Sequence, residues 1–371
     1  FFSERVVVYE EGGLRTESTP TGKLEEAFDA VFWDASPYAW PVLGWPSDIA
    51  SITKEQADEY YALFYQPQNL TAVLVGDFDP KVALALAGKY LGAIPAGNRP
   101  APEMITMESR PLAEKRFHGE AETNPAATVR WHTVAFTHRD APVLEVMNNL
   151  LSGPAGRLRR SLVLKQGVAT SARVAHDPRK YEGSFEVYGE AKEGRTPEEV
   201  EQAIYGEIEK LKNEPVGAAE LQAAKNRYLT AIYRQLGSNF LIGLRYAVSE
   251  GRGDLHGAEK IEAAVQKVTA EDVQRVAKAY LTKEGRAVAI WTRKGGAAED
   301  PELAALPPQA RERARAGLAR IRAATDPEKL QQMIGMFDQM GGQMPPEAKP
   351  AVDFLRRKAE ARLRELSSPR P

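Results

Sequence analysis

Two glutamates near the start of the chain are spaced like a pair on one helical face. Glu4 and Glu11 lie in the stretch "SERVVVYEE", residues 3 to 11, seven positions apart. Because an α-helix has ~3.6 residues per turn, the two carboxylates of a helical stretch would lie two turns apart on the same side. Such a pair either faces solvent or acts together on a metal or substrate, and the spacing alone leaves both interpretations open.

Other residues with metal-binding or nucleophilic chemistry are few and scattered. The chain has no cysteine, which excludes disulfides, thiolate zinc sites and cysteine nucleophiles. Its five histidines form neither H-E-x-x-H nor the inverted H-x-x-E-H, and each is predicted to be an ordinary strand or loop residue. G-x-S-x-G, P-loop and G-x-G-x-x-G motifs are also absent. A metal would therefore have to be held by histidine, glutamate or aspartate.

Composition narrows the class of protein. The 371 residues are 43% hydrophobic and 27% charged, as in globular proteins with more than one core. A formal charge of -2 predicts no general attraction to nucleic acid or to an anionic membrane. No apolar run reaches the ~18 residues typical of a membrane span. The chain does not begin with methionine, so we expect that an upstream segment has been removed or left out.

Hydrophobic periodicity predicts the elements that would position the two glutamates. An amphipathic helix is expected over residues 22–33, followed by an aromatic loop at 36–46 that contains three prolines. A capping box at Thr53 starts the next helix, residues 70–77 are predicted as a buried strand, and 79–92 as a helix. The first hundred residues are thus predicted to be mixed α and β structure.

The sequence also contains an internal repeat. Residues 52–76 align without a gap with residues 268–292, at a constant offset of 216. Both copies have a capping threonine, an amphipathic helix, a turn and an apolar strand, which predicts two related α+β units. A chance match between two generic helix-turn-strand segments is the alternative.

The rest of the chain completes the second unit and adds a tail. Residues 99–111 are rich in proline and read as a linker, and the residues after Gly295 are predicted to be a mostly helical appendage. The expected strands are 127–136, 167–176 and 183–191, and the expected helices are 141–153, 156–163, 197–211 and 218–236.

An ordered series of segments resembles the pitrilysin/insulinase family of zinc metallopeptidases, the inverzincins. The series consists of "ERVVVYEE", "SPYAWPVLGWPSDI", "YQPQNLTAVLVGDFDP", "GRLRRSLVLKQGVATSA" and "VTAEDVQRVAKAYL". The resemblance covers residues 1 to about 295. It implies an α+β fold with two homologous units, each a sheet covered by helices. The implied domains are 1–105, the remainder of the first unit; 106–295, the second unit; and 296–371, the helical tail.

The resemblance also implies a zinc site. In that family a helix with H-x-x-E-H supplies two zinc ligands and the general base, and a glutamate about 75 residues later is the third ligand. By position, Glu11 matches this zinc ligand and Glu4 matches an acidic helper that orients a ligand histidine. The bound Zn²⁺ would lower the pKa of a water that attacks a peptide carbonyl.

The chain departs from the family pattern in three places. It lacks the H-x-x-E-H helix, so the residues given do not complete a catalytic zinc site. Gly12 and Gly13 follow the expected ligand, and two glycines cost about 2 kcal/mol of helix propensity, which would loosen the helix there. Val163 and Thr170 replace an arginine and a tyrosine that contact substrate in the family.

The resemblance implies a zinc-dependent endopeptidase that acts on peptides or unfolded polypeptides. The alternative within the family is a non-catalytic member that serves as partner subunit or scaffold of an active peptidase. Outside the family, a two-unit interaction protein would also fit the repeat. The expected partners are a polypeptide substrate and a second family member in a homo- or heterodimer, with no nucleic acid. Exported bacterial relatives suggest the periplasm.

Overall fold

The structure divides into two compact units, residues 1–294 and 295–371. It is a computed structural model that describes residues 1–17, 19–294, 301–304, 306, 307, 310, 311, 314, 317, 318, 321, 324, 326–341 and 349–367. The expected boundary between 105 and 106 stays a prediction. None of the described helices combines the length and apolar character that a membrane crossing requires.

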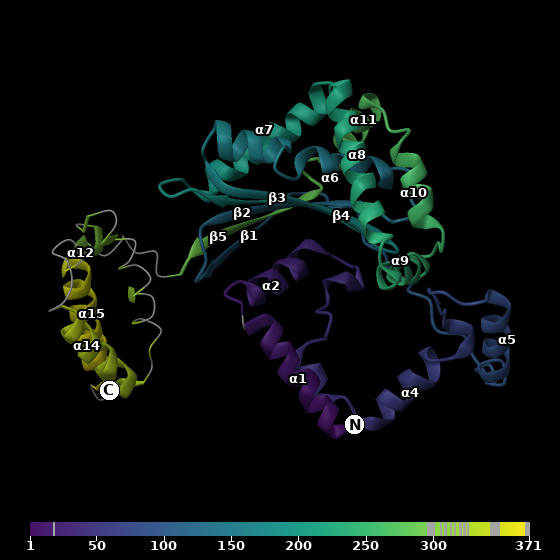
Figure 1. Cartoon of the computed structure of the whole chain (residues 1–371), viewed down its shortest axis with the longest axis horizontal. Coiled ribbons are helices and arrows are strands. Elements are labelled where there is room, and N and C mark those ends of the chain that lie inside the picture. The colour runs from purple at the N-terminus through teal and green to yellow at the C-terminus, as the bar shows by residue number, and fades with distance from the viewer. Residues whose placement is uncertain are drawn as a thin grey trace. The chain divides into compact units, whose positions relative to one another are not determined.

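Helices dominate the first unit, and its described strands all lie after residue 114 (Figure 1). The helices are α1 (Phe2–Glu17), α2 (Gly22–Phe32), α3 (Pro46–Ser51), α4 (Lys54–Phe64), α5 (Pro80–Tyr90), α6 (Ala141–Leu151), α7 (Pro197–Asn213), α8 (Ala218–Gln235), α9 (Asn239–Gly251), α10 (Gly257–Val265) and α11 (Ala270–Tyr280). Two short 3₁₀ turns, η1 (Pro37–Ala39) and η2 (Pro67–Asn69), and one π-helical segment, η3 (Arg159–Lys165), complete the set.

Five strands form one mixed sheet in the order β1-β5-β2-β4-β3. The strands are β1 (Lys115–Ala121), β2 (Ala126–Val134), β3 (Ala169–Pro178), β4 (Glu182–Ala191) and β5 (Arg286–Arg293). β5 pairs in parallel with β1 and antiparallel with β2, so the last strand of the unit lies inside the sheet. The remaining pairs are antiparallel, and β3 has an irregularity between Ala169 and Ser171.

Alternate side chains of the strands fill two different cores. Val129, Trp131, Val288 and Ile290 face the main core, which α6, α7, α8 and α11 close. Their neighbours Ala126, Ala287, Ala289 and Trp291 face the other side and pack with Phe28 and Phe32 of α2. Successive side chains of a strand point to opposite faces of the sheet, so a shift of one residue in the strand register would exchange the two sets. Figure 1 shows α2 on the face of the sheet opposite α6 and α7.

The predicted strand at 70–77 is wrong. Residues 70–75 run through the structure without strand assignment, and most of their side chains are exposed. A strand needs a neighbour to accept its backbone hydrogen bonds, and no other described strand pairs with this segment. Val73 and Val75 instead line a small cavity of about 380 Å³ with Phe240 and Leu244 of α9.

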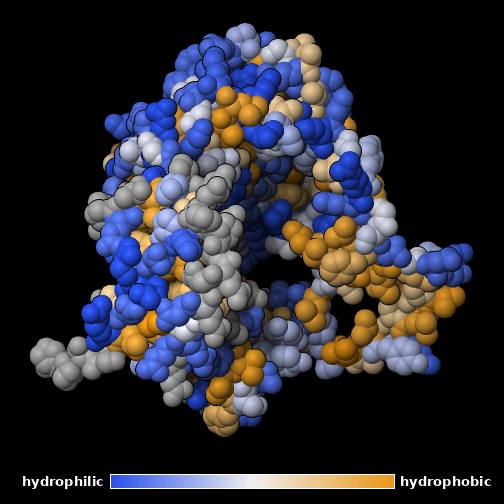
Figure 2. Space-filling model, turned by 60° about the vertical axis from the view of Figure 1, so that its left-hand side comes forward, coloured by the Kyte–Doolittle hydropathy of each residue, from blue (hydrophilic) through white to orange (hydrophobic). Residues whose placement is uncertain are grey.

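The structure gives the two copies of the repeat the same helix. α4 and α11 have equal lengths, begin 216 residues apart, and both start with a capping box, at Thr53 and at Thr269. Their burial differs: α11 buries Val273, Val276 and Ala277, whereas none of the residues of α4 is buried. Apolar side chains of α4 and α5 therefore contribute to the apolar surface seen in the space-filling view (Figure 2).

The second unit, 295–371, is helical over its described residues. It contains α12 (Pro301–Ala304), α14 (Pro327–Gly341) and α15 (Lys349–Ser367). α14 and α15 pack side by side, and Leu330, Phe354 and Ala359 lie fully buried in a separate core. This agrees with the helical appendage predicted from the sequence.

Candidate functional site

Glu4 and Glu11 lie on one helix, as their spacing predicts. Both belong to α1, which continues through Gly12 and Gly13 to Glu17, and the expected loosening at the two glycines stays a prediction. Glu4 is exposed and Glu11 is half-buried. At ~3.6 residues per turn, seven positions bring the two carboxylates to nearly the same side of α1.

One carboxylate ligand does not hold a catalytic zinc by itself. Such a site needs three protein ligands around the metal, usually histidine and glutamate. Among the residues that the structure describes, no group of three or more histidine, aspartate or glutamate side chains is placed to bind a metal. The assignment of Glu11 as a zinc ligand therefore stays a prediction, and the described residues supply no further ligands beside it.

The loop 34–46 follows α2 and packs against α1. An ideal Cβ on Gly12 would lie 4.0 Å from Leu43 Cδ1, which places the middle of the loop beside the turn that carries Glu11. The Arg5 guanidinium donates a hydrogen bond to the Ile52 carbonyl at 2.9 Å, just after α3. The start of α1 is thus held by the segment that follows the loop.

A carboxylate from the linker fixes the start of this loop. The consecutive backbone N–H groups of Asp34, Ala35 and Ser36 donate to Glu108 at 2.8, 3.0 and 2.9 Å. Three successive N–H groups that converge on one anion form a nest. Glu108 thereby joins the loop after α2 to the linker before β1.

Two side chains of the sheet cap the C-terminal end of α2. Lys115 on β1 donates from Nζ to the carbonyls of Val31 and Phe32 at 2.8 and 2.9 Å, satisfying groups that helix geometry leaves without partners. His132 on β2 lies 3.0 Å from the Phe32 carbonyl through Nε2 and stacks on the Phe32 ring at 3.9 Å. These contacts fix the position of α2 on the sheet.

Burial lowers the pKa of His132 to about 4, and the positive charge of Lys115 acts in the same direction. Because this imidazole stays neutral in the folded protein, the unfolded chain binds its proton first as the pH falls below about 6.5. The free energy of unfolding should therefore fall by roughly 1–2 kcal/mol between pH 7 and pH 5, within a window that ends near pH 4. Urea unfolding of the chain at the two pH values measures this loss.

The variant His132→Phe keeps an aromatic ring on Phe32 and removes the titration, so its loss of stability between pH 7 and pH 5 should be smaller by that amount. His118→Asn, at an exposed position of β1, is the matched control and should behave like the parent chain. Equal pH dependence in the parent and in His132→Phe would contradict the assignment.

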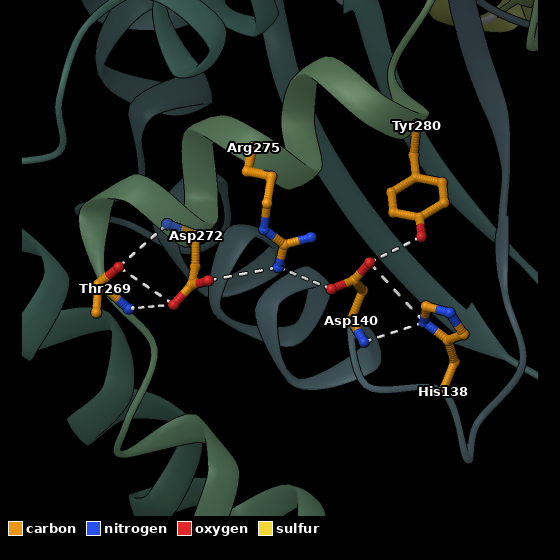
Figure 3. Close-up of polar contacts among 6 residues, drawn as sticks. All are labelled: His138, Asp140, Thr269, Asp272, Arg275 and Tyr280. Carbon is orange, nitrogen blue, oxygen red and sulfur yellow. Dashed lines mark hydrogen bonds and ion pairs between the residues drawn. The ribbon is translucent and has the colours of Figure 1, made fainter.

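A second polar cluster joins α6 to α11 (Figure 3). Asp140 precedes α6 and is nearly fully buried; its carboxylate accepts hydrogen bonds from Arg275 and from the Tyr280 hydroxyl, each at 2.8 Å. The backbone N–H of Asp140 donates to His138 Nδ1 at 3.1 Å, and Arg275 also contacts Asp272. Asp272 in turn forms the capping box of α11 with Thr269, the N-cap residue. The six residues thus form one connected network.

Electrostatics identify this cluster as structural. Burial raises the pKa of Asp140, but the hydrogen bonds from Arg275 and Tyr280 outweigh it and leave the pKa below its ordinary value. Burial and the bond to Asp140 raise the pKa of Tyr280 to about 12. The aspartate therefore stays charged and the Tyr280 phenol stays protonated near pH 7.

The two positions that replace a substrate-contacting pair have other partners. Val163 packs against the main core, and Thr170 donates from Oγ1 to the Glu190 carboxylate at 2.8 Å.

Asp140 was not expected to belong to a cluster, because its partners lie more than 130 residues away in the sequence. An aspartate before a helix predicts a cap, yet its side chain caps nothing in α6.

Comparison with known proteins places the chain. The family model described as Peptidase M16 inactive domain matches residues 51–228. The zinc protease PqqE of Helicobacter pylori is 25% identical over 285 residues, which are 76% of this chain and 64% of that protein. This chain thus spans less than two thirds of the length of that relative.

Solved structures show the same fold. A protease from Helicobacter pylori superposes with a TM-score of 0.73 at 23% identity, covering 78% of this chain and 71% of that one. The periplasmic protease PqqL of Escherichia coli superposes with a TM-score of 0.64 at 17% identity, covering 83% of this chain and 35% of that one.

The fold is that of M16-type peptidases, and the resemblance read from the sequence segments is confirmed. The chain is similar to zinc proteases of the M16 type, and its residues 51–228 match the model described as Peptidase M16 inactive domain.

Proposed function

We propose that the natural protein is a zinc-dependent endopeptidase in which Glu11 is one ligand of the metal and Glu4 is a positioning residue behind it. The observation that carries the proposal is the placement of both glutamates on α1, seven residues apart, in the part of the chain that resembles the ligand-bearing helix of the family. The two histidine ligands and the general base would come from an H-x-x-E-H helix outside the described residues.

Two features support a site completed by further polypeptide. The chain spans 64% of the length of the relative named zinc protease PqqE. In addition, the apolar side chains of α4 and of residues 70–75 are largely exposed, whereas the corresponding side chains of their repeat partners, α11 and β5, are buried in the core. We propose that the missing strands and the H-x-x-E-H helix cover these apolar faces and reach α1.

The proposed substrates are peptides or unfolded polypeptides. Names of relatives as zinc proteases support a polypeptide substrate, and the name of PqqL as a periplasmic protease supports an exported protein. The two homologous α+β halves of the natural protein, or two family members in a dimer, would enclose such a substrate.

The test uses the natural full-length protein. Its zinc content and its cleavage of an unstructured peptide are measured before and after treatment with a chelator, and after zinc is added back. We expect about one zinc per chain, loss of cleavage with the chelator, and recovery with zinc. A full-length protein that keeps no zinc and forms a stable complex with an active peptidase would instead identify the non-catalytic partner subunit.

A further inference from the structure

The loop beside Glu11 is rigid at its base. Glu108 holds the backbone N–H groups of residues 34–36. The Arg179 guanidinium lies over the rings of Trp33 and Tyr38, 5.8 and 4.8 Å from their centroids. Tyr38 itself packs against the core under the sheet. The loop therefore leaves the body of the protein from a fixed position.

The tip of the same loop presents apolar side chains to solvent. Trp40 is 68% exposed, Val42 is 95% exposed and Trp45 is 37% exposed. Pro41 lies between the first two, and Pro46 follows Trp45, so the backbone at the tip has restricted conformations. A grouped set of exposed large apolar residues on a fixed loop is typical of an interaction site.

The charge of the loop indicates what it would bind. Residues 36–46, "SPYAWPVLGWP", contain no aspartate, glutamate, lysine, arginine or histidine. An uncharged surface of indole rings and a valine favours apolar side chains and penalises charged ones, which would lose hydration without gaining a partner.

The loop also lies beside the helix that carries Glu11. Leu43 lies between the exposed residues in the sequence, and its Cδ1 would be 4.0 Å from a Cβ placed on Gly12, one position after Glu11. The exposed apolar side chains of α5, such as Leu84, lie on a separate element further along the chain. The loop combines exposed aromatic side chains with a position beside the ligand-bearing helix.

We infer that Trp40, Val42 and Trp45 form a specificity surface that binds apolar or aromatic side chains of an unfolded polypeptide next to the bond cleaved at the Glu11 site. This inference rests on the proposed function for the identity of the site. Preorganised indole rings bind with little loss of conformational entropy, and buried aromatic anchors dominate recognition of this kind.

The test measures binding separately from cleavage. Chelator-treated full-length protein, which cannot cleave by the proposed reaction, is titrated with a fluorescent unstructured peptide that contains leucine and phenylalanine, and with the same peptide carrying asparagine at those positions. We expect the apolar peptide to bind at least about 10-fold more tightly, and the double variant Trp40→Ser/Val42→Ser to lose that preference. Leu84→Ser on α5 is the matched control and should keep it.

A second measurement keeps the inference testable if the double variant is unstable. The single variant Trp40→Phe is compared with the parent protein by acrylamide quenching of tryptophan fluorescence, with and without the apolar peptide. A quenchable Trp40 component that the peptide protects supports the inference. It is overturned if the double variant binds like the parent, or if Trp40 is already shielded in the peptide-free full-length protein, where another segment would then cover the loop. If the protein binds the apolar peptide but does not cleave it after zinc is added back, the result would count against the proposed function alone.

Discussion

Glu11→Gln should reduce cleavage of an unstructured peptide by the full-length protein by more than ~100-fold. Loss of a group that only orients a metal ligand already costs ~10–100-fold in metal affinity or activity, and Glu11 is proposed to contact the metal itself. The amide keeps the size of the side chain but removes the negative charge that the metal attracts. Zinc content after dialysis and kcat/KM for the peptide measure the two effects together.

The neighbouring glutamate provides a strict control. Glu10 is exposed on the same helix and differs from Glu11 by one position, about 100° around the axis. Glu10→Gln makes the same change of charge and should retain zinc and activity. Glu4→Gln should lie between the two, with a loss of roughly 10–100-fold. If Glu10→Gln and Glu11→Gln were equally active, Glu11 would not be a zinc ligand.

Asp140→Ala should lower the free energy of unfolding by about 2–3 kcal/mol, because it removes a buried charged acceptor of two hydrogen bonds. Arg275 is almost half exposed and can be rehydrated, which keeps the loss below that expected for a fully buried ion pair. The pKa of Asp140 is lowered in the folded protein, so its contribution is present above about pH 4 and is lost as the pH falls further. Urea denaturation at pH 7 measures the change.

Two further variants separate the hydrogen bonds of Asp140 from a general loss of packing. Tyr280→Phe removes one donor and should cost about 1–2 kcal/mol. The double variant Asp140→Ala/Tyr280→Phe should cost less than the sum of the single variants, since both remove the same bond. Asp77→Ala, at an exposed aspartate, should change stability by less than about 0.5 kcal/mol. Strict additivity of the two single changes would contradict the network in Figure 3.

Local signals in the sequence predicted most of the longer helices of the first structural unit, whereas α3, α9 and α10 were not predicted. The capping boxes at Thr53 and Thr269 mark the starts of α4 and α11, because a cap depends on residues three positions apart. The apolar stripe of residues 22–33 became α2, whose Phe28 and Phe32 fill the core under the sheet. The two copies of the repeat were found at a constant offset of 216 because their helices and caps also depend on residues that are close in sequence.

Strands were harder to predict, since pairing joins residues far apart in the chain. Residues 70–77 have the composition of a strand but lack a neighbour among the described residues, whereas their repeat partner β5 has one on each side. The edge strand β1 was not predicted because Lys115, Arg116, His118 and Glu120 interrupt its apolar residues. Charged residues are common on edge strands, where they discourage pairing with other chains.

The candidate site shows the same division between local and distant information. The spacing of Glu4 and Glu11 places them on one face only if the stretch is helical, and α1 meets that condition. Their roles still depend on a likeness to the family. The cluster around Asp140 had no signal in the sequence, because its members meet only when α6 and α11 pack together.

The interior position of β5 has a consequence for the order in which the protein can fold. β1 pairs only with β5 in the described sheet, and Lys115 is matched with Ala287. During synthesis, β1 would therefore leave the ribosome long before its neighbour and wait, unpaired, while the intervening helices emerge. Contacts of such sequence separation form slowly and expose apolar surface in the meantime. We expect the nascent chain from β1 onward to remain a substrate for chaperones until residue 293, the end of β5, has been made.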